Sequence, residues 1–137
     1  MDAALLAPPR RLSVPIDNHW GAGEMAVMDF GDPRRPVDLV FSHANGFNAA
    51  TYRTLPSPLS ASLPIWGPGL RTIARPKTSW RDHRDDLLSL LETIDGPPVV
   101  LAGHSMGGTA SLLAAGGRPE RVSSLVLFDP VVWKRSA

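Results

Sequence analysis

Runs of hydrophobic residues separated by short polar segments recur along the chain and predict strands and helices in alternation. Short apolar runs rich in Val, Leu, Ile and Phe indicate strands, whereas a longer stretch with helical spacing indicates a helix. The predicted strands lie at residues 11–16, 25–30, 37–41, 62–66, 99–102 and 124–128, and the predicted helices at 49–55, 79–95 and 109–115. The stretch that follows the fourth of these strands, residues 67–77, predicts no regular element.

The clearest helical pattern lies between residues 79 and 95. Four apolar residues recur there at the spacing i, i+3, i+4 and i+7, which places them on one face of a helix. These residues are Leu87, Leu90, Leu91 and Ile94. We expect this stripe to be buried, and we expect the helix to end before Gly96-Pro97-Pro98.

The order of the predicted elements indicates the fold class. The first two strands are separated by a turn-rich segment and are typical of an antiparallel hairpin. The later strands alternate with helices, which favours an α/β fold with a mostly parallel sheet and helices on both faces. The chain length fits one domain, which we expect to span residues 11–137 after a loose N-terminal tail at residues 1–10.

Composition narrows the class of function. The 137-residue chain has a formal net charge of +1, so its charge balance does not favour nucleic acid or an anionic membrane as a partner. It has no cysteine, and its four histidines lack the spacing of a zinc site, so we expect neither a metal nor another cofactor. No apolar run has the length of a membrane span or of a secretory signal, which leads us to expect a cytoplasmic protein.

One motif stands between a predicted strand and a predicted helix. Residues 103–108 read Gly-His-Ser-Met-Gly-Gly, a G-x-S-x-G pattern that follows the apolar run 99–102. A sharp turn from a strand into a helix exposes the hydroxyl of its middle residue, here Ser105, for nucleophilic attack. The backbone N–H of Met106 would then lie at the start of the helix, where it can stabilise a developing negative charge.

Two other interpretations of this motif stay open. Such a glycine-rich turn can simply allow a strand and a helix to pack closely, or it can bind a phosphate at the start of a helix. The phosphate interpretation would be stronger with a G-x-G-x-x-G or a G-x-x-x-x-G-K-[ST] pattern, and the chain has neither. The strand, turn and helix in succession favour the nucleophile.

A second small and polar segment follows the predicted strand 37–41. It reads Ser-His-Ala-Asn-Gly-Phe-Asn over residues 42–48. Open α/β sheets form their sites at the carboxyl ends of their strands, so this segment is a candidate part of the same site.

The segments His-Ala-Asn-Gly-Phe at 43–47 and Gly-His-Ser-Met-Gly-Gly at 103–108 resemble those of the α/β-hydrolase superfamily. The resemblance runs from about Phe30 to Val132 and includes Leu-Val-Leu-Phe-Asp-Pro at 125–130, which looks like the sixth strand of the family. It implies that the third and fifth strands are neighbours. It also implies a set of oxyanion donors at the site, namely the N–H of Met106 and that of Phe47 or Asn45.

The chain departs from the family pattern in its histidines. The family order is nucleophile, acid and then histidine, yet every histidine of this chain precedes Ser105. We expect His104 to pack or orient the turn and His43 to brace the oxyanion loop. Asp129 is a candidate acid after the sixth strand, with a hydrogen-bonding role at the strand end as the alternative.

The chain also ends soon after the predicted sixth strand, where the family fold continues. The resemblance therefore implies the N-terminal part of an α/β-hydrolase domain that is incomplete after that strand. We expect an open edge at 125–128 and possible self-association through it. A second departure is a loop near residues 69–74 that lacks the Asp-Leu-Arg-Gly-His-Gly-like stretch of relatives, which puts the fourth strand in doubt.

These observations lead to one functional prediction with alternatives. The resemblance implies a serine hydrolase that cleaves a small-molecule ester through an acyl-Ser105 intermediate and is nearly inactive as this chain alone. One alternative is a non-catalytic fragment or interaction module that keeps the fold. Another is a transferase or lyase that uses the same turn.

Overall fold

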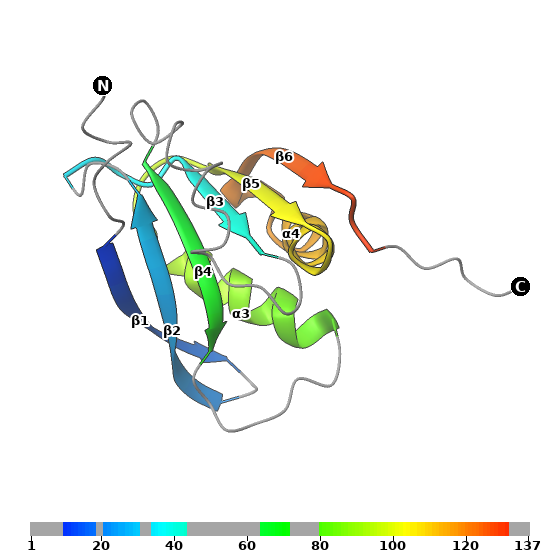
Figure 1. Ribbon diagram of the computed structural model, residues 1–137. Helices are drawn as coiled ribbons and strands as arrows, with labels where there is room; N and C mark the ends of the chain where they lie inside the picture. Colours follow the sequence, from blue (N-terminus) through cyan, green and yellow to red (C-terminus); the bar gives the residue numbers. More distant parts are fainter. Residues whose placement is uncertain (1–9, 19–20, 31–33, 44–63, 72–79, 132–137) are drawn as a thin grey trace, which may run out of the picture.

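The computed structural model describes residues 10–18, 21–30, 34–43, 64–71 and 80–131 (Figure 1). Within these ranges the chain forms six strands, two α-helices and one short 3₁₀ turn. In chain order they are β1 (Arg10–Asn18), β2 (Gly21–Phe30), β3 (Leu39–Ser42), β4 (Ile65–Arg71), α3 (Trp80–Glu92), β5 (Val99–His104), α4 (Met106–Gly117), the turn η2 (Pro119–Arg121) and β6 (Val122–Phe128). The helix expected at 49–55 lies outside the described residues, as do residues 1–9 of the expected tail. Arg10, which we assigned to that tail, is instead the first residue of β1.

The six strands form one sheet in the order β1-β2-β4-β3-β5-β6. Strands β1 and β2 pair antiparallel as the predicted hairpin, and β2 pairs antiparallel with β4. The pairs β4–β3, β3–β5 and β5–β6 are all parallel. The prediction of an α/β fold with a mostly parallel sheet is therefore confirmed.

The sheet contains a reversal of strand order beside β3. The chain passes from β3 to β4 on one side and then returns to place β5 on the other side. The predicted adjacency of the third and fifth strands is confirmed, because they pair over four residues from Leu39–Val100 to Ser42–Gly103. Ligand sites of open α/β sheets form at such reversals, outside the carboxyl ends of the strands.

The fourth strand corrects the sequence interpretation. It spans Ile65–Arg71 rather than 62–66, and it includes Gly67, Pro68 and Gly69, a stretch for which the sequence predicts no regular element. Its parallel ladder with β3 is limited to the pairs Leu39–Ile65 and Val40–Trp66, so Pro68 lies beyond this ladder and removes no hydrogen bond from it. Pairing with β2 on the other side continues past the proline with a register shift.

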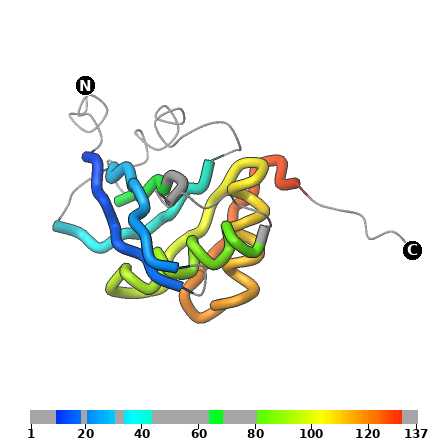
Figure 2. Tube along the Cα trace, turned by 90° about the horizontal axis from the view of Figure 1, so that it is seen from below, coloured from blue at the N-terminus to red at the C-terminus, as the bar shows by residue number. Residues whose placement is uncertain are grey.

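The main hydrophobic core lies between one face of the sheet and the two described helices. The predicted apolar stripe is buried as expected, but only Leu87, Leu90 and Leu91 lie on α3; Ile94 follows the end of the helix at Glu92 and is buried as well. They meet β1 and β2 through Val14 and Val27, and Ala110 and Ala114 of α4 join the same cluster. Both helices thus cover the same side of the sheet, as the two views show (Figures 1 and 2).

A smaller cluster lies on the opposite face of the sheet. It comprises Phe30, Phe41, Ile65 and Ala102, which alternate along their strands with residues of the main core. On the same face of β6, Val126 and Phe128 are 42% and 44% exposed. The described residues therefore leave part of this apolar face open near β6.

Candidate active site

Ser105 stands on a strained turn between β5 and α4. Its backbone has φ 54° and ψ −114°, in a region that residues other than glycine rarely occupy. Such strain costs about 1–3 kcal/mol and persists only where the surrounding structure enforces it. The residue is partly exposed, although the helix that begins immediately after it is mostly buried.

Backbone hydrogen bonds hold this turn from both sides. The N–H of Ser105 donates to the carbonyl oxygen of Phe128 at 3.0 Å, which ties the turn to the end of β6. The carbonyl oxygen of Ser105 accepts from the N–H of Thr109 at 3.1 Å, which is the first bond of the helix. The unusual backbone angles of Ser105 are therefore enforced by a neighbouring strand as well as by the helix.

Close backbone contacts explain the glycines of the motif. A Cβ on Gly103 would overlap the carbonyl group of Gly107, and a Cβ on Gly107 would overlap the carbonyl group of Ser42. The same Cβ on Gly107 would lie only 2.6 Å from the carbonyl oxygen of His43. The first turn of α4 thus packs against both β5 and the end of β3, which brings the turn at 103–108 next to Ser42 and His43, the described start of the other predicted segment.

The carboxyl ends of three adjacent strands carry the candidate residues. His43 directly follows β3, Ser105 follows β5, and Asp129 follows β6. His43 is 5% exposed, whereas Asp129 is exposed and has φ 47°, a second positive value for a residue other than glycine. The structure therefore gathers these three residues at one edge of the sheet.

The other candidates differ in how far the structure describes them. Met106 is the first residue of α4, where the backbone N–H groups have no acceptor within the helix. His104 is the last residue of β5 and is partly buried beside β6, where it pairs with Phe128 in the register. Asn45 and Phe47 lie outside the described residues, so the second oxyanion donor stays a prediction.

Thr109 is a residue of this site that the sequence did not reveal. It is 5% exposed, and its Oγ1 donates to the carbonyl oxygen of Val131 at 2.6 Å and lies 3.3 Å from the carbonyl oxygen of Ser105. It therefore ties the strained turn to the segment that follows β6 and carries Asp129. The sequence could have indicated this role, because Thr109 lies four residues after Ser105 and a threonine hydroxyl can donate to the carbonyl oxygen of the preceding helical turn.

The described part of the chain shows neither a metal site nor a membrane span. Among those residues, no three His, Asp or Glu side chains are grouped so that they could hold a metal ion. In the same part of the chain, neither helix has the length and apolar character needed to cross a membrane.

The fold and the turn at Ser105 together define a class of α/β protein whose site lies at the carboxyl ends of parallel strands. Residues 39–136 match the sequence model of the alpha/beta hydrolase family. The chain belongs to this family. The resemblance seen in the two motifs is thereby confirmed over most of the chain.

Lipases and esterases are among the known proteins that this chain resembles. It is 46% identical over 46 residues to lipase LipV of Mycobacterium tuberculosis, a match that covers 34% of this chain and 18% of that protein. It is 47% identical over 51 residues to monoglyceride lipase of Rattus norvegicus, covering 34% of this chain and 17% of that protein. These matches thus cover less than a fifth of the length of either relative.

Solved structures share the fold over nearly the whole chain. A membrane phospholipase A described as a bacterial virulence factor superposes with a TM-score of 0.80 at 24% identity, covering 96% of this chain and 43% of that one. At this identity the similarity supports the fold alone. The present chain spans less than half of that structure.

Proposed function

We propose that this chain carries the nucleophile, Ser105, of a serine hydrolase that cleaves small-molecule carboxylic esters. The observation that carries the proposal is the strained backbone of Ser105 at the start of α4. A hydroxyl on such a turn projects beyond the sheet edge, next to backbone donors that can stabilise an oxyanion. The lipase names of the relatives support an ester as substrate.

In the proposed reaction, the Oγ of Ser105 attacks the carbonyl carbon of the ester and its proton passes to a base. The oxyanion that forms accepts hydrogen bonds from the N–H of Met106 and from a second donor at Phe47 or Asn45. The alcohol then leaves with the proton, and water hydrolyses the acyl-serine to release the acid. His43 and His104 brace the site, and Asp129 is the candidate acid.

The base is the part of the mechanism that residues 106–137 do not supply. They contain no histidine, whereas the family order places one after the nucleophile. Without a base the serine is a weak nucleophile, and only the catalysis due to the oxyanion donors and substrate binding remains. We therefore propose that the chain by itself is nearly inactive.

A fluorophosphonate probe tests the assignment of Ser105. We expect slow covalent labelling of the chain, detected by intact mass and located at Ser105 by peptide mapping. Labelling should disappear in Ser105→Ala and persist in Ser123→Ala, which removes an exposed hydroxyl on β6. Absence of labelling, or equal labelling of the Ser105→Ala variant, would overturn the nucleophile assignment.

One observation favours the alternative of an interaction module. Val126 and Phe128 on β6 are 42% and 44% exposed, and β6 is an edge strand of the described sheet. Apolar edge strands can pair with other chains, so this alternative includes self-association through β6. Sedimentation velocity should then show oligomers that a Val126→Lys variant abolishes, and a monomer at all concentrations would exclude it.

A further inference from the structure

Two residues other than glycine have positive φ in the described part of the chain, and they lie next to each other. They are Ser105, with φ 54°, and Asp129, with φ 47°. The N–H of Ser105 donates to the carbonyl oxygen of Phe128, the residue immediately before Asp129, at 3.0 Å. Strained backbone persists only where surrounding contacts enforce it. The contacts around these two residues therefore decide whether Ser105 keeps its conformation.

Two hydrogen bonds attach the segment 128–131 to the turn at Ser105 and the first turn of α4. At the start of the segment, the carbonyl oxygen of Phe128 accepts from the N–H of Ser105. At its end, the carbonyl oxygen of Val131 accepts from the Oγ1 of Thr109 at 2.6 Å. That distance is typical of a short O–H···O hydrogen bond. The segment is thus held at both ends.

The backbone between these two bonds is stiff. The ring of Pro130 restricts its φ to about −65°, and a proline also restricts the backbone of the residue before it, here Asp129. The Cβ of Pro130 lies 3.3 Å from the place that a Cβ on Gly108 would occupy, so the proline packs on the first turn of α4. A displacement at one end of the segment is therefore passed to its other end, where Phe128 holds the serine.

Thr109 also holds the peptide group that carries the proposed oxyanion donor. Its backbone N–H donates to the carbonyl oxygen of Ser105 at 3.1 Å. The peptide group between Ser105 and Met106 is planar and trans, so its N–H points away from its carbonyl oxygen. Fixing that carbonyl therefore fixes the direction of the Met106 N–H.

The two actions of Thr109 come from different groups of the residue. Its hydroxyl has one proton, and the shorter distance assigns this proton to the carbonyl of Val131 rather than to that of Ser105 at 3.3 Å. The backbone N–H thus holds the peptide group after Ser105. The hydroxyl holds the peptide group before Ser105, through the segment 128–131.

We propose that Thr109 is a positioning residue for the reaction of Ser105, a role that rests on the proposed hydrolase function. The peptide groups on either side of Ser105 determine its φ and ψ, and these angles set where its Oγ lies relative to the Met106 N–H. Loss of the Thr109 hydroxyl frees the segment 128–131, and Ser105 then relaxes toward ordinary backbone angles. The nucleophile and the oxyanion donor are then poorly aligned, which slows the attack.

The rate of fluorophosphonate labelling of Ser105 tests this role. In labelling, the bond from Oγ to phosphorus forms, the bond from phosphorus to fluorine breaks, fluoride leaves and the serine proton passes to solvent. Thr109→Val removes the hydroxyl and keeps the shape, and it should lower the rate about tenfold. This is less than the 10²–10³-fold loss typical of removing an oxyanion donor, because the donor remains.

Two further substitutions at Thr109 separate the hydroxyl from the rest of the side chain. Thr109→Ala is a second variant without the hydroxyl and should also label about tenfold more slowly, as expected for a misaligned oxyanion donor. Thr109→Ser restores the hydroxyl and should recover most of the wild-type rate. Intact mass gives the rates, and thermal unfolding shows which variants are folded.

Nuclear magnetic resonance of the labelled protein reports on the oxyanion donor directly. The phosphonyl oxygen of the adduct stands in for the oxyanion of the ester reaction. Selective ¹⁵N labelling of the four methionines leaves few amide resonances, and Met106→Leu identifies that of Met106. This amide proton should move downfield when wild type is labelled, and it should move less in labelled Thr109→Val.

Ser111→Ala is the matched control on the same helix. Ser111 is fully buried, and its Oγ lies 3.4 Å from the carbonyl oxygen of Ala102 on β5. This substitution therefore removes a buried hydroxyl of α4 that is not bonded to the segment 128–131. It should leave the labelling rate unchanged.

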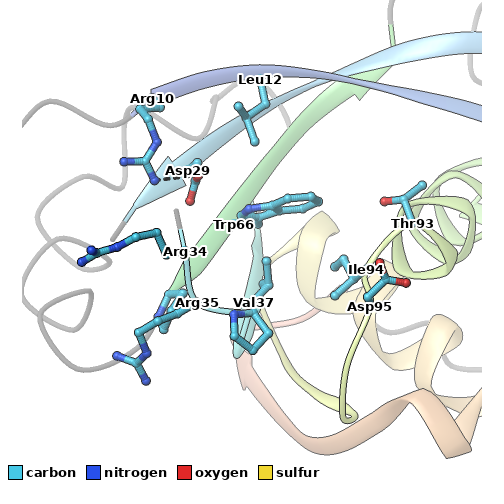
Figure 3. Close-up of a pocket in the computed structure, with 12 residues that line it drawn as sticks. Arg10, Leu12, Asp29, Arg34, Arg35, Val37, Trp66, Thr93, Ile94 and Asp95 are labelled. Atoms are coloured by element: carbon cyan, nitrogen blue, oxygen red, sulfur yellow. Dashed lines mark hydrogen bonds and ion pairs between the residues drawn. The ribbon is translucent and has the colours of Figure 1, made fainter. Parts of the chain in front are cut away.

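A cavity at the other end of the sheet provides a control for distant changes in packing. It has a volume of about 600 Å³, and Val37 and Trp66 line it at the amino ends of β3 and β4 (Figure 3). Ser105 follows the carboxyl end of β5, which runs parallel to β3, and a six-residue strand spans roughly 20 Å. Trp66→Phe alters the wall of this cavity and should not change the labelling rate.

The outcomes separate this inference from the proposed function. A wild-type chain that is not labelled at Ser105 would overturn both. Labelling of wild type with an unchanged rate in the folded Thr109→Val or Thr109→Ala variant would overturn the inference alone. A Thr109→Ser variant as slow as Thr109→Val, or equal slowing by Ser111→Ala, would also overturn it, because the loss would then come from packing.

Discussion

Gly107 at the start of α4 lies directly against the carbonyl group of Ser42 at the end of β3, with no room for a side chain between them. This contact holds the turn at 103–108 beside Ser42, the first residue of the other segment that the sequence marks as a site candidate. It connects a helix and a strand more than sixty residues apart in the chain. The arrangement around Ser105 therefore depends on a backbone contact that only glycine permits.

Substitution of Gly107 by alanine should strongly destabilise the fold. The added Cβ would overlap the backbone of Ser42, which cannot move without disturbing β3, and the expected loss is about 3 kcal/mol or more. Gly116→Ala in the same helix is the matched control, because a Cβ there has no neighbour within 4 Å. That change should stabilise the helix by up to about 1 kcal/mol. Urea unfolding of both variants measures the difference, and equal effects would contradict the contact.

Replacement of Ser105 by glycine should relieve strain that alanine keeps. At φ 54° and ψ −114° a Cβ is unfavourable. The strain energy that glycine removes is larger than the conformational entropy that glycine adds to the unfolded chain. We expect Ser105→Gly to be about 1 kcal/mol more stable than Ser105→Ala. Both variants lack the hydroxyl, so the comparison isolates the backbone. A glycine variant no more stable than the alanine variant would show that the turn is relaxed.

Loss of the Thr109 hydroxyl should loosen the link between the turn and the segment after β6. Thr109→Val keeps the shape but leaves the carbonyl of Val131 without this donor, at a cost of about 1–2 kcal/mol. Thr93→Val is the control, since Thr93 is an exposed residue whose hydroxyl donates to the carbonyl oxygen of Leu90 at 2.7 Å. The control should lose about 0.5 kcal/mol or less. Denaturant unfolding compares them, and equal losses would argue against a special role for Thr109.

The packing of α3 on the sheet predicts a further contrast. Leu90 is fully buried, so Leu90→Ala should cost about 2–5 kcal/mol through lost burial and a residual cavity. Leu112 on α4 is 41% exposed, and Leu112→Ala should change stability by less than about 1 kcal/mol. Thermal unfolding gives both values. A small effect at Leu90 would mean that α3 does not pack on the sheet as described.

Local patterns were sufficient to predict much of this fold. The apolar stripe on α3 follows from its spacing, because a helix places residues three and four apart on one face. The turn at Ser105 follows from an apolar strand, a glycine-flanked serine and a helical segment in succession. Each of these signals depends on residues that are near one another in the chain.

The fourth strand shows where local patterns fail. Gly67, Pro68 and Gly69 carry the composition of a turn, yet they continue β4 because β2 pairs with that part of the strand. Strand propensity depends strongly on the neighbours a strand finds, and the identity of those neighbours is not a local property. The ends of β4 are therefore set by its pairing with β2 and not by its own composition.

The amino-acid sequence by itself determined the alternation of elements, the buried stripe on α3 and the position of Ser105 between a strand and a helix. Only the tertiary structure decided that Thr109 holds the segment after β6, and that the first turn of α4 lies against the end of β3. These residues are brought together by strand pairing and helix packing across long separations in the chain. Contacts of that kind form because the sheet buries apolar surface as a whole, which no short stretch of sequence specifies.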